Sequence, residues 1–196
     1  MGVMDLLFGR RGTSPSKSEP LSALATAHFA LREHYQLRPR EVAGICLRLL
    51  PSVSLEQTKQ DLDNLFQSGE SPAQVRYRLH QDEHGYLWLL LEDPDFERLV
   101  RTVRMVSFTV EANGHADRLL AAVFRFQEEE GGGSAPNVYW VYSYQRGKFY
   151  PFVPIGSGEQ RDNGYELRLG AALASGLGLP VEKDKAHWYP LWDLPL

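Results

Sequence analysis

Four side chains that could bind a metal ion lie close together in the sequence: His80, Asp82, Glu83 and His84. Imidazole nitrogens and carboxylate oxygens are ligands that zinc accepts in proteins. The preceding residues alternate between apolar and polar up to His80, and a turn is expected to end at Gly85, so the cluster lies at the end of a predicted strand. At such a junction the two histidines do not share a face, as they would on a helix. We therefore interpret the cluster as a solvated polar turn and expect neither a metal nor a cofactor.

A second polar group consists of Arg146, Arg161, Asp162 and Asn163, which could line a pocket for a small metabolite. An enzyme of this kind would have an enclosed polar pocket near the two arginines. The simpler interpretation assigns Arg146 to a turn, pairs Arg161 with a neighbouring acid and uses the other two residues to cap a helix. The sequence contains no phosphate-binding loop, dinucleotide-binding glycine pattern, nucleophile elbow or zinc-protease helix. We therefore expect a protein that is not an enzyme.

The stretch from Asn137 to Pro154, NVYWVYSYQRGKFYPFVP, is richer in aromatic residues than any other window of its length. Val138–Tyr144 is an unbroken run of β-branched, aromatic and small residues, which predicts a central strand. Gln145–Lys148 contains a glycine that suits a tight turn, and Phe149–Val153 predicts a returning strand. Its proline cannot donate to a neighbouring strand, so the returning strand should be short or at an edge. An aromatic edge beside Arg146 is a candidate contact surface for another protein.

Side chains of the predicted central strand alternate between its two faces. At least one face is expected to be ordinary core. Tyrosine and tryptophan are enriched both in cores with one wet edge and at binding hot spots, so composition does not decide which face binds a partner. One face carries Val138, Trp140, Tyr142 and Tyr144, and the other carries Tyr139, Val141 and Ser143.

Hydrophobic periodicity and capping signals place the remaining elements. A capping box is expected at Ser54–Gln57, a first-turn proline at Pro94, and a reciprocal cap between Asn163 and Glu166. Helices are expected from Ser18 to before Pro39, from Ser54 to Gln67, from Asp93 to about Asn113, and from Gly164 to Ser175. Strands are expected at Val42–Leu50, Gln74–His80, Tyr86–Leu91 and Leu119–Phe126.

The order of elements from Val42 to Phe126 is strand, helix, strand, strand, helix, strand, which is the ferredoxin-like pattern. It predicts an α+β two-layer fold with an antiparallel sheet covered on one face by helices. The aromatic hairpin and a C-terminal helix are added to this core. The other face is left for a partner, a second subunit or the C-terminal tail, whose two tryptophans would be costly to expose. An alternative is the small α+β fold of bacterial secretion chaperones.

Composition predicts one globular domain. The chain has 196 residues, of which 43% are hydrophobic, enough for a substantial core. We expect a single domain over residues 18–196, preceded by a tail and linker over residues 1–17. The formal net charge of −4, with basic residues scattered among acidic ones, disfavours nucleic-acid binding. Cys46 is the only cysteine, which excludes an intrachain disulfide and a cysteine-based zinc site, and it is expected to be buried.

The N-terminus lacks both the basic leader and the long apolar stretch of a signal peptide, and no apolar run is long enough to cross a bilayer. We therefore expect a cytoplasmic protein. Val3, Met4, Leu7 and Phe8 precede two arginines and could form a foot that touches a membrane surface or a partner's groove. The alternative is a tail that packs on its own domain or stays frayed.

Several groups of residues carry a resemblance to a known family. They are Met1-Gly2 with Asp5 and Leu7-Phe8-Gly9-Arg10, Gly85-Tyr86-x-Trp88, Arg146-Gly147-x-Phe149-Tyr150-Pro151-Phe152-x-Pro154, Arg161-Asp162-Asn163 with Glu166-Leu167, and Trp188-Tyr189-Pro190-x-Trp192. In these groups the chain resembles, nearly end to end, the bacterial PspA-associated family called PspAB. The hairpin block is the most specific part. The acidic, glycine-rich loop Glu128–Pro136 looks longer than the family usually has.

The resemblance implies an accessory protein of the phage-shock response, located in the cytoplasm or peripherally at the inner membrane. Its implied partner is a PspA-like coat protein, which protects a stressed inner membrane. Family members are also associated with a membrane-bound metalloprotease of the HtpX type. The resemblance carries no catalytic residues to this chain.

Residues and resemblance together predict a non-enzymatic adaptor that binds a protein partner through its aromatic hairpin and C-terminal tail, with the N-terminal foot as a second anchor. A chaperone-like module that binds peptide segments and forms a homodimer is one alternative. A small-metabolite enzyme is a less favoured one. The residues expected to contact the partner are Arg146, Phe149, Tyr150, Phe152, Trp188 and Trp192.

Overall fold

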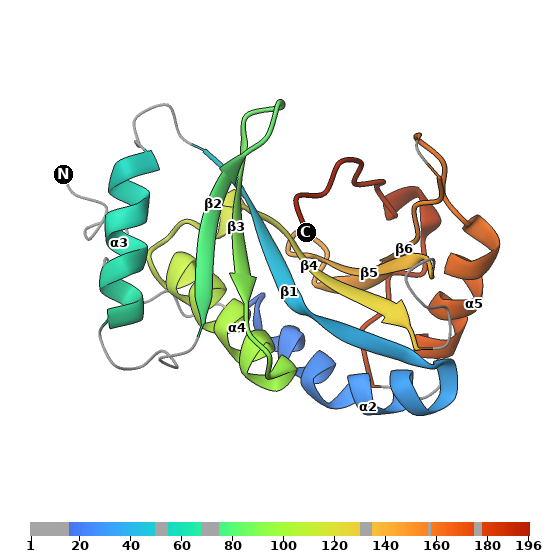
Figure 1. The fold of residues 1–196 in the computed structure, drawn as a ribbon. Helices are drawn as coiled ribbons and strands as arrows, with labels where there is room; N and C mark the ends of the chain where they lie inside the picture. Colours follow the sequence, from blue (N-terminus) through green and yellow to red (C-terminus); the bar gives the residue numbers. More distant parts are fainter. Residues whose placement is uncertain (1–15, 50–54, 68–74, 130–134, 157, 175–177) are drawn as a thin grey trace.

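The computed structural model describes residues 16–49, 55–67, 75–129, 135–156, 158–174 and 178–196. Within these residues the chain forms one six-stranded antiparallel sheet (Figure 1). The strands are β1 (Leu37–Arg48), β2 (Arg76–Gln81), β3 (Tyr86–Glu92), β4 (Leu119–Glu128), β5 (Asn137–Ser143) and β6 (Lys148–Phe152). The α-helices are α2 (Leu24–Tyr35), α3 (Leu55–Gln67), α4 (Phe96–Ala112) and α5 (Asn163–Ala174), and short 3-10 helices are η1 (Glu19–Ala23), η2 (Ala116–Arg118) and η4 (Lys185–His187).

The strand order is β2-β3-β1-β4-β5-β6, and every neighbouring pair is antiparallel. The first four of these strands, with α3 and α4 as their connections, have the order and directions of the ferredoxin-like core. The aromatic hairpin of β5 and β6 extends the sheet beyond β4. The predicted α+β architecture is therefore confirmed, including the place of the hairpin at the edge.

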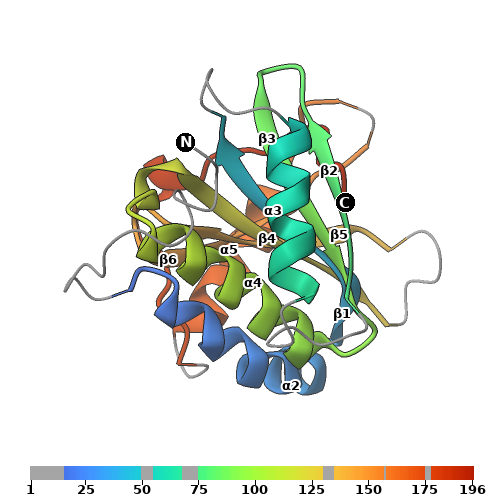
Figure 2. The same cartoon turned by 90° about the vertical axis from the view of Figure 1, so that its left-hand side faces the viewer.

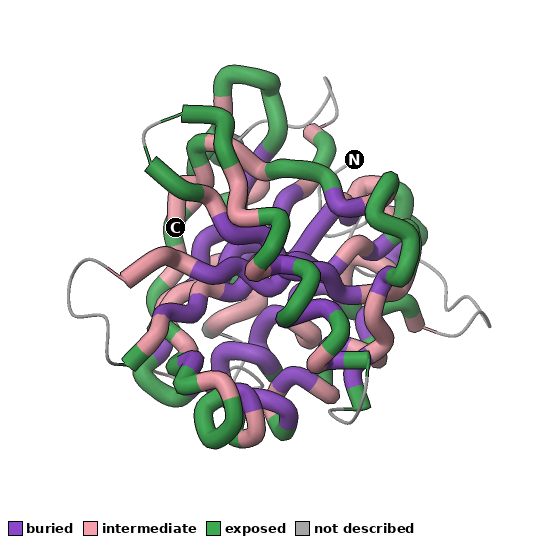
Figure 3. The backbone as a smooth tube through the Cα atoms, turned by 90° about the vertical axis from the view of Figure 1, so that its right-hand side faces the viewer, coloured by how far each residue is buried: buried purple, intermediate pink, exposed green. Residues whose placement is uncertain are grey.

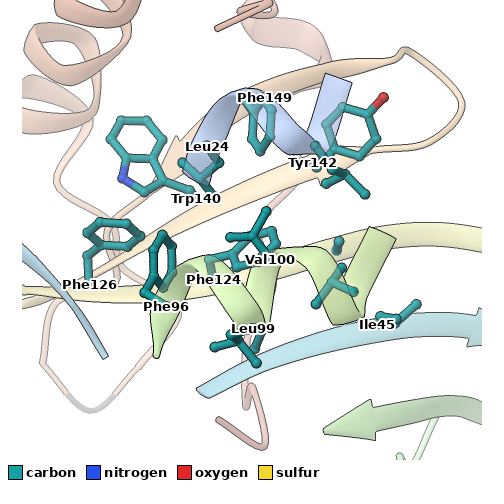
Figure 4. Packing of buried hydrophobic residues seen from close by; sticks show 14 of the residues in the cluster. Leu24, Ile45, Phe96, Leu99, Val100, Phe124, Phe126, Trp140, Tyr142 and Phe149 are labelled. Carbon is teal, nitrogen blue, oxygen red and sulfur yellow. The ribbon is translucent and has the colours of Figure 1, made fainter. Parts of the chain in front are cut away.

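The helices and the C-terminal tail lie on opposite faces of the sheet (Figures 1 and 2). The larger core lies between the helices and the sheet, where Leu99 and Val100 of α4 pack against Phe124 of β4 and Trp140 of β5 (Figure 4). All four side chains are fully buried. Burial is concentrated in the strands, as the purple segments in Figure 3 show. The sheet is thus the element that fixes the position of everything else.

The alternation predicted for the aromatic strand is confirmed in β5. The set that begins with Val138 joins the core under the helices, whereas Tyr139 and Val141 join a second core under the C-terminal tail. Both sets are therefore core, which goes beyond the expectation that at least one of them would be. Ser143, at the end of the second face, is half-buried.

Strand β1 begins at Leu37, five residues before the predicted start at Val42, and ends at Arg48. Helix α2 ends at Tyr35, and Gln36 follows it in the left-handed conformation with a φ of 53°. The prediction was wrong because proline usually ends a helix, so we expected the strand to start only after Pro39. In the structure Pro39 lies inside the strand. The sheet accommodates it with a register shift between Pro39 and Ala43 in the pairing with β4.

Three helix starts also differ from prediction. The helix expected from Ser18 opens as the 3-10 helix η1, and α2 itself begins at Leu24. Helix α4 begins at Phe96, because the carboxylate of Asp95 accepts a hydrogen bond from the Arg98 amide at 3.0 Å and caps it. In α5 the cap is Asp162, which accepts from the Tyr165 amide at 2.8 Å. Glu166 does not cap that helix; its carboxylate is buried and has other partners, described below. The other elements lie within a few residues of their predicted positions.

Candidate partner-binding site

Most of the aromatic residues predicted to contact a partner are buried inside the chain. Phe149 and Phe152 are fully buried, Tyr150 is 2% exposed, and Trp188 is 9% exposed. Only Arg146 is exposed, and Trp192 is half-buried. The four buried side chains fill the chain's own cores and are not accessible to a partner as they lie here.

The edge of the aromatic hairpin is covered by residues 179–182. The Phe149 amide donates to the Pro180 carbonyl at 2.7 Å, and the Glu182 amide donates to the Phe149 carbonyl at 2.8 Å. These bonds form a short parallel bridge between Phe149 and Val181. Strand β6 is an edge strand of the sheet, as predicted, but at this point its backbone is already paired.

Trp188 fastens the C-terminal tail to the body of the protein. Its ring stacks on Tyr150, with centroids 6.4 Å apart and planes 16° apart, and its Nε1 donates to the Glu182 carbonyl at 2.9 Å. Helix α5 leaves room for the ring at Gly170, where a Cβ would lie 2.7 Å from Trp188 Cη2. The tail therefore begins its path across the sheet from a tightly packed point.

Arg146 supports this anchor through Glu182. Its Nε donates to Glu182 Oε2 at 2.8 Å, and the Glu182 side chain is only 3% exposed. The Asp184 amide donates to the other carboxylate oxygen at 3.0 Å. The hydrogen bond from Arg146 is the main reason that the pKa of Glu182 falls from 4.5 to about 2. The turn arginine thus has a structural role.

Arg161 has a separate carboxylate partner. Its Nε lies 2.9 Å from both oxygens of Glu166, and the Val153 amide donates to the same carboxylate at 2.7 Å. Arg161 Nη1 donates to the Trp188 carbonyl at 2.8 Å, and its guanidinium lies 5.1 Å from the centroid of the Phe152 ring. The interpretation that Arg161 pairs with an acid and that Asp162 caps a helix is confirmed. The two arginines bind different acids instead of lining one pocket.

The tail is also held at its far end. Arg78 of β2 donates to the Pro195 carbonyl at 3.0 Å, and Arg125 of β4 lies 3.4 Å from the Leu196 carbonyl oxygen. Between Trp188 and these contacts, residues 189–194 cross the sheet as an arch (Figure 1). We call residues 189–194 the strap.

A hollow of about 640 Å³ lies between the strap and the sheet, and we call it the strap hollow. Strands, the β2–β3 turn and the strap all contribute to its lining, so it is framed by segments far apart in the sequence. A second hollow of about 480 Å³ shares Glu159, Leu191, Trp192 and Asp193 with it. The strap hollow is lined by Cys46, His80, Gln81, Asp82, Glu83, His84, Tyr86, Trp88, Leu120, Ala121, Ser143, Tyr150, Glu159, Tyr189, Pro190, Leu191, Trp192 and Asp193.

The cluster of His80, Asp82, Glu83 and His84 lies at the rim of the strap hollow, with His80 in β2 and the other three residues in the β2–β3 turn. Asp82 holds the turn, because its Oδ1 accepts from the amides of His84 and Tyr86 at 3.0 and 2.9 Å. Its Oδ2 accepts from Trp88 Nε1 at 3.0 Å. Among the residues that the structure describes, no group of three histidine, cysteine or carboxylate side chains could hold a metal ion.

Cys46 lies at the floor of the strap hollow and is 6% exposed, as predicted. Burial is the main cause that raises the pKa of its thiol to about 12. At neutral pH the side chain is therefore a neutral thiol and not a nucleophilic thiolate.

The N-terminal foot, with Val3, Met4, Leu7 and Phe8, lies outside the described residues. At the first described residues, the hydroxyls of Ser16 and Ser18 donate hydrogen bonds to the carboxylate of Glu111 in α4. None of the described helices is long and apolar enough to cross a membrane.

The strap hollow was not predicted from the sequence. Several of its lining residues were singled out for other reasons but were not connected with Trp88, Glu159 or Tyr189; among them are His80, Asp82, Glu83, His84, Tyr150 and Trp192. The one signal available was the cost of exposing the two tryptophans of the tail, and the free face was left open to a partner, a second subunit or the C-terminal tail. The structure shows that the tail packs on this face, but that alternative does not predict a hollow beneath it.

The model of the PspAB family, PspA associated protein B, matches the chain over residues 1–196. The chain belongs to the PspAB family. Because the match covers every residue, the resemblance read from the hairpin block and the terminal tryptophans is confirmed. No curated protein and no solved structure matches the chain significantly.

Gly170→Ala should loosen the Trp188 anchor. Alanine normally stabilises a helix relative to glycine, but here its methyl group would collide with the indole ring. We expect the free energy of unfolding to fall by about 1–3 kcal/mol, with a red shift in tryptophan fluorescence. Gly164→Ala, in the same helix, is the control, because its nearest contact would be an ordinary 3.4 Å. A stabilised Gly170→Ala variant would contradict the packing described here.

Glu182→Gln should destabilise the protein in a pH-dependent way. At pH 7 we expect a loss of about 2 kcal/mol, because a charged hydrogen bond to Arg146 is removed. The pKa of this group is lowered on folding, so its stabilisation is complete above 4.5 and lost as the pH falls towards 2. The difference between variant and wild type should therefore shrink over that range in denaturant titrations. Exposed Glu159→Gln should show no such dependence, and an equal loss at pH 2 and pH 7 would refute the assignment.

Proposed function

We propose that this member of the PspAB family is a non-enzymatic adaptor that associates with a PspA-type protein and contacts it through the face of the sheet crossed by the strap. The family description names an association with PspA. We choose this surface because it contains the strap hollow. It is framed by segments anchored at both ends, so a partner would meet a preorganised surface, which lowers the entropic cost of binding.

The strap supplies side chains suited to such a contact. Tyr189 is 55% exposed, which is more than most aromatic residues of the described chain. Trp192 is half-buried and packs edge-on against Phe152, with ring centroids 5.2 Å apart. Tyrosine and tryptophan are the residues most enriched at binding hot spots. The contact surface we propose therefore keeps Trp192 from the sequence prediction and replaces the buried aromatic residues by Tyr189, while Arg146 supports the surface through its ion pair with Glu182.

The polar groups near the strap support a binding role over a catalytic one. Arg146 and Arg161 each have a buried carboxylate partner, and both pairs help to hold the tail. Asp82 accepts three hydrogen bonds, one from the β2–β3 turn and two from β3. Structural roles therefore account for the positions of these side chains. The thiol of Cys46 is neutral at physiological pH.

The N-terminal foot completes the proposal as a second anchor. Its apolar residues followed by arginines suit an inner-membrane surface, or a membrane-bound partner such as a metalloprotease of the HtpX type. The chaperone-like alternative differs in one observable, because it predicts a homodimer. Sedimentation of the purified chain separates the two, since a monomer is expected of the adaptor.

Tyr189→Ala should weaken binding to a PspA-type protein about tenfold, because an exposed aromatic anchor is worth at least ~1.4 kcal/mol at a hot spot. The measurement is quantified binding of the purified proteins. Removing this side chain leaves intact the Tyr189 carbonyl, which accepts from the Tyr150 hydroxyl at 3.1 Å. The fold should therefore be unchanged.

Phe29→Ala is the matched control. Phe29 is 58% exposed and lies on α2, on the opposite face of the sheet. It should bind like wild type. If Phe29→Ala weakens binding and Tyr189→Ala does not, the contact lies on the helices. If wild type does not bind a PspA-type protein at all, the proposed function fails.

A further inference from the structure

The charges around the strap hollow indicate the chemistry of the segment that fits it. We propose that the hollow binds a short protein segment in which arginine or lysine side chains alternate with apolar ones. This inference rests on the proposed function and specifies the part of the partner that is recognised.

Acidic side chains reach the rim of the hollow from three separate parts of the chain. Asp82 and Glu83 come from the β2–β3 turn, Glu159 from the loop after β6, and Asp193 from the strap. Among the described residues that line the hollow, none is a lysine or arginine, and only His80 and His84 could add positive charge. The surface therefore carries a concentration of negative charge although the whole chain has a net charge of only −4.

Three of these acids have no arginine partner, whereas several buried acids of the fold do. Glu182, Glu166 and Asp93 each pair with an arginine. Within the described part of the chain, Glu83, Glu159 and Asp193 take part in no ion pair; these three are exposed. A cationic segment would supply the counter-charges that these carboxylates lack within the described fold.

The floor and walls of the hollow add an apolar requirement. Tyr189, which is 55% exposed, and half-buried Trp192 line it with accessible aromatic rings, and Leu191 adds an aliphatic surface; the rings of Trp88 and Tyr150 are already covered by the chain itself. Aromatic faces attract arginine and lysine through cation–π interactions and also bury apolar side chains. A purely polar cation would leave the rings of Tyr189 and Trp192 uncovered, and an anionic lipid surface would be repelled by the acids. A segment that combines cationic and apolar side chains satisfies both features.

The volume is suited to a few side chains. About 640 Å³ lies within the range of roughly 300–1,000 Å³ that is typical of hollows that enclose a ligand. A segment that enters between the strap and the β2–β3 turn would place cations at the rim and apolar groups against Leu191 and Trp192. The hollow is thus large enough for a short segment and too small for a folded domain.

The test is isothermal titration calorimetry of the full chain with a synthetic peptide that alternates arginine and leucine. Two matched peptides replace the arginines by glutamates or the leucines by serines. We expect the arginine–leucine peptide to bind at least about tenfold more tightly than either control peptide, and its affinity to fall with added salt. Equal binding of all three peptides, or no binding of the first, would overturn the inference.

Two protein variants locate the site. Glu83→Gln/Glu159→Gln/Asp193→Asn removes three charges at the rim, and asparagine suits position 193, where φ is 55°. We expect it to weaken peptide binding about tenfold, since three exposed charges contribute about 0.5 kcal/mol each. Glu33→Gln/Glu56→Gln/Asp117→Asn removes the same number of charges from exposed positions elsewhere and should bind like wild type. An equal effect of both variants would assign binding to net charge and refute the site.

The same variants separate this inference from the proposed function. If a PspA-type protein binds wild type but the rim variant binds it equally well, the adaptor role stands and the inference is wrong. If the peptide binds at the rim while no PspA-type protein binds, the inference stands for another partner and the proposed function fails. If deletion of residues 1–15 tightens peptide binding at least tenfold, the chain's own N-terminal segment is the occupant, which overturns the inference of a partner segment.

Discussion

A sheet with apolar side chains on both faces needs a cover on both, and this requirement governs the structure. In β5, Trp140 packs under the helices while Val141 packs under the C-terminal tail. The helices of a ferredoxin-like core cover only one face. The second face is therefore covered by a segment without regular structure, which must be fixed by specific contacts because it has no helical or strand bonding of its own.

Those contacts explain the charged residues that first suggest a ligand site. Arg146–Glu182 and Arg161–Glu166 meet at Trp188, one through the carbonyl of Glu182 and the other through the carbonyl of Trp188 itself. Buried ion pairs gain little net stability over apolar packing, but removing one partner is costly. Their effect here is to fix where the tail begins, and so to fix the position of the strap over the sheet.

The fold could largely be predicted from the sequence because its signals are local. The alternation in β5, the glycine turn before β6 and the order of elements all follow from neighbouring residues. The start of β1 could not, because Pro39 is tolerated only through a register shift with a strand far away in the sequence. The burial of Phe149 and Tyr150 was missed for a similar reason: an aromatic edge strand looks like a contact surface until residues 179–182 and Trp188 are placed on it. The strap hollow depends on where the two ends of the C-terminal tail are fixed. No local sequence pattern predicts those positions.

A partner is expected to bind on the strap face. Hydrogen exchange of the full chain, measured with and without a PspA-type protein, can locate the contact. We expect slower exchange in the strap and in the β2–β3 turn around Glu83, with α2 and α4 unchanged. Protection confined to α2 and α4, with the strap unaffected, would contradict it.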